Sequence, residues 1–519
     1  MTLLAVEQSS VELGDLYLML AVGAGVVLVS VAAARVAARA GLPVLLAYLG
    51  VGLLLGEDVL GLRFDDAALA QALAIAALAV ILVEGGISTK LSDFRPVLAP
   101  ATVLATIGVF ISAGITAAAA HLLLGVNWHL ALLIGAVISS TDAAAVFSVM
   151  RSARLPKRLS GLVEAESALN DPPAIMLVLT FSATTLDLSE PVPLLGRMVY
   201  QLVAGGLMGV VLAGAGVWLL RRLTLPASGL YPIATFACGI LAFAVASLAQ
   251  ASGFLAAYLA GVVLGNAKLS HRRAIGSVAE GMAWIAQIGL FVMLGLLATP
   301  SELPAAVIPA LVIGAALLFV ARPVSVLVCL LPFRVRLREQ AFLSWAGLRG
   351  AVPIVLSTIP VVAQVPGSEQ LFNLIFVLVV VFTVIQAPAL PWLARRLRLV
   401  TDQVGPELQI EVAPLDTMAA DLIQLTVDER SRLRGVYIRE LRLPAPAAVT
   451  LIVREGTPLV PQPETRLRTG DQLLVLTTAP VREATERRLR ALARAGRLAR
   501  WRGDVGDPEP PPERTAAAP

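Results

Sequence analysis

The amino-acid sequence predicts an α-helical polytopic membrane protein with a small cytoplasmic α+β lobe at its carboxyl end. Of the 519 residues, 57% are hydrophobic and only 15% are charged, a composition typical of membrane proteins and not of a large soluble core. Apolar runs of roughly the 20 residues that cross a bilayer recur between residues 12 and 394. After Arg398 the pattern changes to short alternating segments. We therefore expect a membrane domain at 1–400, a lobe at 401–500 and a disordered tail at 501–519.

The apolar runs divide into about thirteen predicted membrane spans. They lie at 12–34, 43–56, 67–88, 97–124, 129–150, 160–186, 194–222, 230–249, 253–266, 282–299, 303–331, 340–362 and 371–394. Lys and Arg collect in cytoplasmic loops, and with the amino terminus outside nearly all basic loop residues fall on one side of the membrane. The sequence therefore predicts a multi-pass protein of the bacterial inner membrane, with its amino terminus outside and its carboxyl terminus in the cytoplasm.

Two of the predicted spans are interrupted near their middle. The fifth has four consecutive polar residues of types that favour helix N-caps, which predicts a stop and a restart: Ser139, Ser140, Thr141 and Asp142. The twelfth is interrupted by Gly347, Arg349, Gly350 and Pro353. Spans one to six and eight to thirteen form two halves in which these two spans correspond. Paired interruptions of this kind indicate the substrate site of a transporter built from inverted repeats.

The sixth span carries an acidic residue, Asp171, that needs an explanation. An ionisable side chain near the bilayer centre costs roughly 2.5–3.5 kcal/mol, so it normally faces a cavity, a partner or an ion. Ser167 lies one helical turn before Asp171, and Asn170 is its neighbour. A carboxylate, an amide oxygen and a hydroxyl suit an alkali cation, and Pro172 and Pro173 leave carbonyls of the preceding turn free as further ligands. The sequence therefore predicts an alkali-cation site at Asp171, with no transition metal.

The same region leaves two questions open. Ser and Asn often join helices in membranes, although Asp171 is a costly residue for that purpose. Arg349 needs a buried counter-charge, for which Glu166 is the first candidate, followed by Glu164 and Glu84. Glu84 is more simply explained as a residue at the end of a helix. The partner of Arg349 is thus a prediction for the tertiary structure to decide.

Other classes of protein lack their signatures in this sequence. A potassium channel would need a filter of the TVGYG kind, and an intramembrane hydrolase would need a nucleophile with its base or an HExxH motif. Neither occurs. The three histidines and two cysteines lack metal-ligand and disulfide spacing. The net charge of +4 is spread over many short loops, which indicates membrane topology and no binding of nucleic acid. We therefore expect no enzyme activity and no cofactor.

The lobe is predicted from alternating apolar and polar segments. Strands are expected at 408–412 and 421–427, in AAVTLIVRE and in DQLLVLT. A short amphipathic helix is expected to begin at Ser431, and a basic helix is expected at 481–500. A lobe of this size is too small to transport ions by itself, so regulation or dimerisation is its expected role.

Several runs in both domains match known families. SSTDAAAVFSVM, EAESALNDP, YLAGVVLGN, WIAQIGLFVMLGLL and SWAGLRGAVPIVL resemble the NhaP-type potassium/proton antiporters of the monovalent cation:proton antiporter superfamily. The lobe, with LRGVYIRELRLP and TRLRTGDQLLVL, resembles the TrkA-C (RCK-C) domain of potassium transport proteins.

The resemblance implies an antiporter that exchanges K⁺ for H⁺ by alternating access and serves pH and potassium homeostasis. It also implies a homodimer in membrane lipid, in which a core bundle moves against a dimerisation bundle, and leaves a small-molecule or nucleotide ligand of the lobe open. The implied cation and proton site is Asp171 with Asn170, Ser167, Thr141 and Asp142, and Glu166 lies close by. Sodium/proton exchange remains the alternative, since oxygen ligands alone do not distinguish the two ions. Because Asn170 cannot titrate, exchange of one proton per cation is expected.

Overall fold

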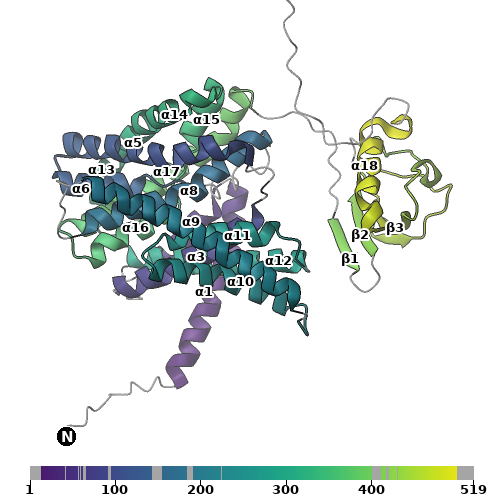
Figure 1. The fold of residues 1–519 in the computed structure, drawn as a ribbon, viewed down its shortest axis with the longest axis horizontal. Helices are drawn as coiled ribbons and strands as arrows, with labels where there is room; N and C mark the ends of the chain where they lie inside the picture. The colour runs from purple at the N-terminus through teal and green to yellow at the C-terminus, as the bar shows by residue number, and fades with distance from the viewer. Residues whose placement is uncertain are drawn as a thin grey trace, which may run out of the picture. The chain divides into compact units, whose positions relative to one another are not determined.

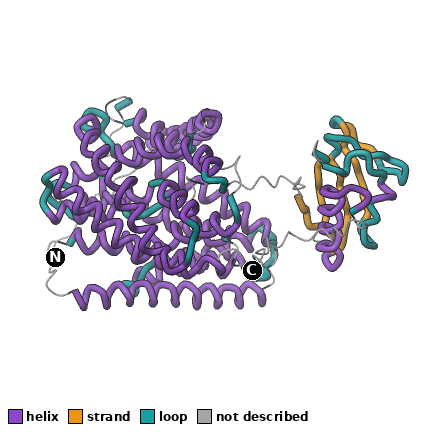
Figure 2. The backbone as a smooth tube through the Cα atoms, turned by 90° about the horizontal axis from the view of Figure 1, so that it is seen from above, coloured by secondary structure: helices purple, strands orange, loops and turns teal. Residues whose placement is uncertain are grey.

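Helices form the membrane domain of the computed structural model, and a strand-rich lobe follows it in the chain (Figure 1, Figure 2). The chain divides into two units, Met1–Val400 and Thr401–Pro519. The structure describes residues 13–40, 42–56, 58, 60–61, 66–89, 91, 95–142, 146, 155–183, 191–223, 225–269, 271–399, 411–415, 420–428 and 431–499. The tail predicted at 501–519 lies outside these residues.

The long helices follow the apolar runs of the sequence. They are α1 (Leu13–Ala40), α2 (Val44–Leu55), α3 (Ala67–Ser88), α5 (Leu98–Leu124), α6 (Trp128–Ile138), α8 (Lys157–Ser182), α9 (Pro191–Arg222), α10 (Leu230–Leu248), α11 (Gly253–Asn266), α12 (Arg272–Leu297), α13 (Leu303–Ala316), α14 (Arg322–Leu330), α15 (Leu337–Ala346), α16 (Ala351–Val362) and α17 (Ser368–Arg396). A π-helical turn at Leu317–Ala321 joins α13 to α14.

Within the described residues, eight helices are long and apolar enough to cross a membrane. Helices α15 and α16 make a ninth candidate, because together they pass the same test but are bent by 51° at their junction. Helices α2, α6 and α11 are apolar but shorter. The multi-pass fold is therefore confirmed, whereas the predicted count of about thirteen spans is not.

The membrane helices pack as two bundles. The core bundle contains α5, α6, α8 and α13–α17, and the second bundle contains α1–α3 and α9–α12. In the second bundle, α2 packs on α12 while α3 packs on α11. Under the predicted division into halves, the second helix of each half thus packs on the third helix of the other. This exchange is the contact pattern expected of two similar halves.

Glycines set the two close helix crossings of the second bundle. A side-chain carbon added at Gly86 of α3 would collide with the backbone of Tyr258 and Gly261 in α11. One added at Gly295 of α12 would collide in the same way with the backbone of α2 at Gly52. Small residues allow such close approach where lipid gives helices no hydrophobic reason to associate.

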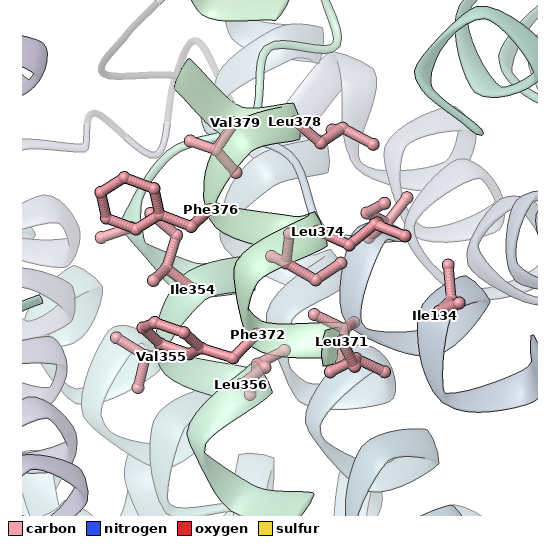
Figure 3. Packing of buried hydrophobic residues seen from close by; sticks show 14 of the residues in the cluster. Ile134, Ile354, Val355, Leu356, Leu371, Phe372, Leu374, Phe376, Leu378 and Val379 are labelled. Carbon is pink, nitrogen blue, oxygen red and sulfur yellow. The ribbon is translucent and has the colours of Figure 1, made fainter. Parts of the chain in front are cut away.

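Apolar side chains of the last two membrane helices fill the centre of the core bundle. Figure 3 shows Phe372 and Phe376 of α17 beside Ile354 and Val355 of α16. All four side chains are buried. Removing a large buried side chain such as Phe costs roughly 3–5 kcal/mol, so this packing holds α16 in place beside the polar region described below.

The lobe is a five-stranded antiparallel sheet with one long helix. The strands β1 (Glu411–Leu415), β2 (Ala420–Thr426), β3 (Ala448–Arg454), β4 (Thr457–Leu459) and β5 (Gln472–Thr478) lie in the order β1-β2-β5-β3-β4, and α18 (Ala479–Ala495) follows β5. Leu489 and Leu492 of α18 share a buried cluster with Ile452 and Val475 of the sheet. The predicted strands of the lobe and its basic helix are confirmed, apart from residues 408–410, which lie outside the described residues.

The amphipathic helix predicted to begin at Ser431 is wrong. This segment forms turns and a short 3₁₀ helix, Ile438–Glu440. Gly435 has a positive φ of 84°, and Tyr437 forms a β-bridge with Arg466. A left-handed residue ends a helix, and the bridge gives the backbone of Tyr437 a partner outside the segment.

An ion pair fastens β3 of the lobe to the start of β5. Arg454 donates two hydrogen bonds of 2.8 Å to the carboxylate of Asp471, and the backbone N–H of Arg468 donates a third of 2.7 Å. Burial by itself raises the pKa of Asp471, but these hydrogen bonds outweigh burial and hold the pKa below its ordinary value. The stability that this pair contributes is therefore present above the ordinary aspartate pKa and is lost as the pH falls through the lowered one.

Candidate cation and proton site

The two interrupted spans cross at their breaks. Helix α6 ends at Ile138, and α15 and α16 are separated by Gly347–Gly350. The backbone N–H of Asp142 donates a 2.8 Å hydrogen bond to the carbonyl of Leu348, which joins the two non-helical segments. A side-chain carbon at Gly350 would collide with the carboxylate of Asp142, so the crossing requires glycine there. Both predicted interruptions are present, and the predicted restart of the fifth span lies almost entirely outside the described residues.

Asp171 of α8 faces the break in the fifth span. The Ser140 hydroxyl donates a 2.6 Å hydrogen bond to Oδ1 of Asp171. The Asn170 amide donates a 2.6 Å hydrogen bond to Oγ1 of Thr141, which lies 3.1 Å from Oγ of Ser167. Asp171 is only 6% exposed and Asn170 only 1%. The structure thus gathers Asp171, Asn170, Ser167 and Thr141 in one buried polar cluster.

One member of this cluster was missed from the sequence. Ser140 was noted only as part of the helix break, although it is the residue that contacts the Asp171 carboxylate. The signal was available, because Ser140 precedes Thr141 in the same polar run. Its orientation was not, since a non-helical backbone has no fixed periodicity from which to derive the direction of a side chain.

The cluster offers oxygen atoms of the kind that alkali cations prefer. They belong to the Asp171 carboxylate, the Asn170 amide and the Ser140, Thr141 and Ser167 hydroxyls. Oδ1 of Asn170 is buried and has no hydrogen-bond partner among the described residues. Because an unsatisfied buried acceptor is costly, this oxygen is suited to a cation. The donor set therefore fits an alkali ion as the substrate.

The buried ion pair beside the cluster differs from the predicted one. Glu166 pairs with Arg322 of α14, at 2.5 Å between Oε1 and Nη1, and not with Arg349 as predicted. Arg349 instead donates a 2.8 Å hydrogen bond to the carbonyl of Gly347 in its own break. Arg322 follows directly after the π-helical turn, which shifts the helix by a fraction of a turn and re-aims the residues beyond it. The prediction of an Arg349–Glu166 pair is thus wrong in its basic partner.

Both arginines line a small cavity at the break in the twelfth span, together with Leu317, Leu318, Ser344, Gly347, Leu378, Phe382 and Gln386. Its volume is about 10 Å³, close to the space that one water molecule needs. Nε of Arg322 and both Nε and Nη2 of Arg349 have no hydrogen-bond partner among the described residues. The positive charge of Arg349 therefore lies at the non-helical segment, against carbonyl groups of the chain.

Glu164, the other predicted supporting carboxylate, lies away from Arg322 and Arg349. Its Oε1 accepts a 2.9 Å hydrogen bond from the hydroxyl of Thr89 at the end of α3. Glu84 of α3 accepts a 2.7 Å hydrogen bond from Ser88 one turn later. Neither residue joins the cluster around Asp171 in the hydrogen bonds of the described residues.

A buried carboxylate at the crossing of two interrupted helices defines the class of secondary ion transporters. The family model described as "Sodium/hydrogen exchanger, transmembrane" matches residues 26–396, and the TrkA-C domain model matches residues 422–490. The chain therefore belongs to the sodium/hydrogen exchanger family, whose members are cation:proton antiporters and not enzymes. The predicted family resemblances of both domains are confirmed.

Curated relatives agree with this assignment over most of the chain. The sequence is 38% identical over 462 residues to the K(+)/H(+) antiporter NhaP of Alkalimonas amylolytica, covering 86% of this chain and 79% of that protein. It is 36% identical over 496 residues to the K(+)/H(+) antiporter NhaP2 of Shewanella oneidensis, covering 93% and 85%. The fold matches that of the sodium proton antiporter MjNhaP1 of Methanocaldococcus jannaschii with a TM-score of 0.64 at 20% identity, covering 74% of this chain and 99% of that one.

Proposed function

We propose that this protein exchanges potassium for protons at Asp171 by alternating access. The observation that carries the proposal is the burial of Asp171 at the crossing of the two breaks, with Ser140 on its carboxylate. A bare carboxylate that moved between two access states would carry its charge through a medium of low dielectric constant. A proton or a bound cation removes that charge. Movement is then favoured only when one of them is bound, and the two compete for the same carboxylate.

The number of protons follows from the ionisable groups in the cluster. Asn170 occupies the place beside Asp171 and cannot titrate, so a single carboxylate of the cluster binds either ion. Exchange of one proton for one cation moves no net charge. Asp142 contacts the break through its backbone, and titration of its side chain during the cycle would change this ratio.

The names of the curated relatives support potassium as the transported ion, while the sodium proton antiporter that shares the fold keeps sodium as the second candidate. The site chemistry does not separate the two ions, because both accept carboxylate, amide and hydroxyl oxygens. We further propose a homodimer in the bacterial inner membrane. The one-sided distribution of Lys and Arg in the loops supports an external amino terminus and a cytoplasmic lobe.

Proteoliposomes with a trapped pH dye test this proposal. We expect external potassium, and rubidium more weakly, to drive proton movement at concentrations at which lithium has no effect. Exchange should be insensitive to a clamped membrane potential, because no net charge moves. Exchange with sodium and none with potassium would establish the sodium alternative. Proton movement driven by voltage alone, in vesicles that contain equal potassium inside and outside, would contradict the one-to-one ratio.

The lobe is proposed to regulate exchange without forming the ion pathway. Asp471→Ala leaves Arg454 without its carboxylate and removes the acceptor of the Arg468 N–H, and losing such a partner costs about 1–3 kcal/mol. We expect the lobe to become more sensitive to proteolysis while the membrane domain still exchanges cations, with a changed dependence on pH. Thr450→Ala, on the exposed side of β3, is the matched control. Complete loss of exchange by a folded Asp471→Ala protein would show that the lobe is part of the transport machinery.

A further inference from the structure

Thr89, Glu164 and Tyr258 form an inter-bundle cluster away from the cation site. Oγ1 of Thr89, at the end of α3, lies 2.9 Å from Oε1 of Glu164 on α8. The same oxygen lies 2.7 Å from the carbonyl of Gly85 and 3.3 Å from the hydroxyl of Tyr258 on α11. Thr89 is only 3% exposed. Since α3 and α11 belong to the second bundle and α8 to the core bundle, this contact joins the two bundles.

The contacts of Thr89 can be counted against the protons available to make them. A hydroxyl group has one hydrogen and can donate one hydrogen bond, while its oxygen accepts up to two. If Glu164 is ionised, both it and the carbonyl of Gly85 are acceptors, and the single Thr89 hydrogen cannot serve both fully. If Glu164 carries a proton, it donates to Thr89, and Thr89 donates to Gly85. Only in the protonated form are both short contacts complete hydrogen bonds.

The surroundings of Glu164 also favour the neutral form. Among the described residues, the other ionisable groups beside it are Tyr258 of α11 and Glu84 of α3, and Glu280 of α12 lies beside Glu84. Ionisation of Glu164 would add a negative charge near two carboxyl groups, and like charges disfavour each other's ionised form. Deprotonation of Glu164 thus both removes a hydrogen bond across the bundles and introduces repulsion between them.

The position of Glu164 connects this cluster to the transport site. Asp171 lies seven residues further along α8, which is two turns and nearly the same face of the helix. The helix is continuous between them, so α8 carries both residues as one body. A contact that holds Glu164 against α3 and α11 therefore resists any movement of Asp171 relative to the second bundle.

We propose that Glu164 is a second proton-binding residue of this protein, distinct from the exchange site, whose protonation holds α8 against α3 and α11 and whose deprotonation releases α8 to move. This inference rests on the proposed exchange at Asp171. It assigns to the inter-bundle cluster the control of the maximal rate, whereas proton competition at Asp171 controls the apparent affinity for the cation. Exchange is then slowed at acid pH even when potassium is saturating.

The test compares Glu164→Gln with the unmodified protein in proteoliposomes at saturating potassium over a range of pH. The glutamine amide always donates to Thr89, so it mimics the protonated form. We expect the maximal rate at alkaline pH to fall roughly fivefold, the effect of about one hydrogen bond, and the acid inhibition of that rate to disappear. The KM for potassium should not change, because the oxygens around Asp171 are untouched. Ser88→Ala, which removes a neighbouring hydroxyl that contacts Glu84, is the matched control.

Thr89→Val provides an independent variant of the same size. It removes the hydroxyl that both bundles share, so we expect the rate at acid pH to rise towards the alkaline rate. A maximal rate with the unmodified pH dependence in either folded variant overturns the assignment of Glu164. That result leaves the exchange function intact, whereas failure of the unmodified protein to exchange any cation for protons refutes the exchange proposal itself.

Discussion

Asp171→Asn is expected to reduce cation/proton exchange to the level of empty vesicles in both directions. A neutral amide can neither release a proton nor attract a cation by its charge, so both halves of the cycle lose the group on which they depend. The fold should persist, because the asparagine carbonyl can still accept the hydrogen bond from Ser140. Thermal unfolding in detergent should therefore occur at the same temperature or higher, since a buried ionisable group has been removed.

Glu302→Gln is the matched control for Asp171→Asn. Glu302 is an exposed carboxylate that accepts a 2.9 Å hydrogen bond from Asn373 and lies outside the polar cluster. It should exchange potassium at the rate of the unmodified protein. Normal exchange by Asp171→Asn would refute the assignment of the site, whatever the ion.

Arg322→Ala is expected to destabilise the membrane domain by about 3–5 kcal/mol, the cost of removing one partner of a buried ion pair. Glu166 would keep its charge or take up a proton in a site that is 3% exposed. Arg349→Ala should cost less, because the hydrogen bond that it loses is made to the carbonyl of Gly347 and not to a carboxylate. The measurement is the thermal unfolding of both variants in the same detergent, followed by size-exclusion chromatography.

A double variant separates the ion pair from other effects of Arg322. Replacing a buried pair by apolar groups of similar size is often neutral or stabilising, so Glu166→Leu combined with Arg322→Met should recover most of the stability that Arg322→Ala loses. Greater damage from Arg349→Ala than from Arg322→Ala would restore the pairing predicted from the sequence. Equal damage from the double variant and from Arg322→Ala would show that the charge pair contributes little.

The main features of the membrane domain follow from local properties of the sequence. Hydropathy runs fix where helices lie, because every backbone group in lipid needs a partner within its own helix. The consecutive polar residues 139–142 and the glycines around Arg349 predict the two breaks, since such residues weaken a helix wherever it packs. Asp171 stands out for the same reason, as an ionisable residue in an apolar run. The exact number of spans was less certain, because helices as short as α2 and α11 fall below the usual length for crossing a bilayer.

The sequence by itself thus determined a multi-pass membrane fold, the two breaks and the carboxylate at the site. Only the tertiary structure decided which side chains meet there: Ser140 on Asp171, Arg322 instead of Arg349 on Glu166, and Thr89 on Glu164. The physical reason is that hydropathy and capping depend on neighbouring residues in the chain, whereas a hydrogen bond or ion pair depends on which faces of distant helices turn towards each other. The π-helical turn before Arg322 changes that face by a fraction of a turn, and no periodicity in the sequence indicates it.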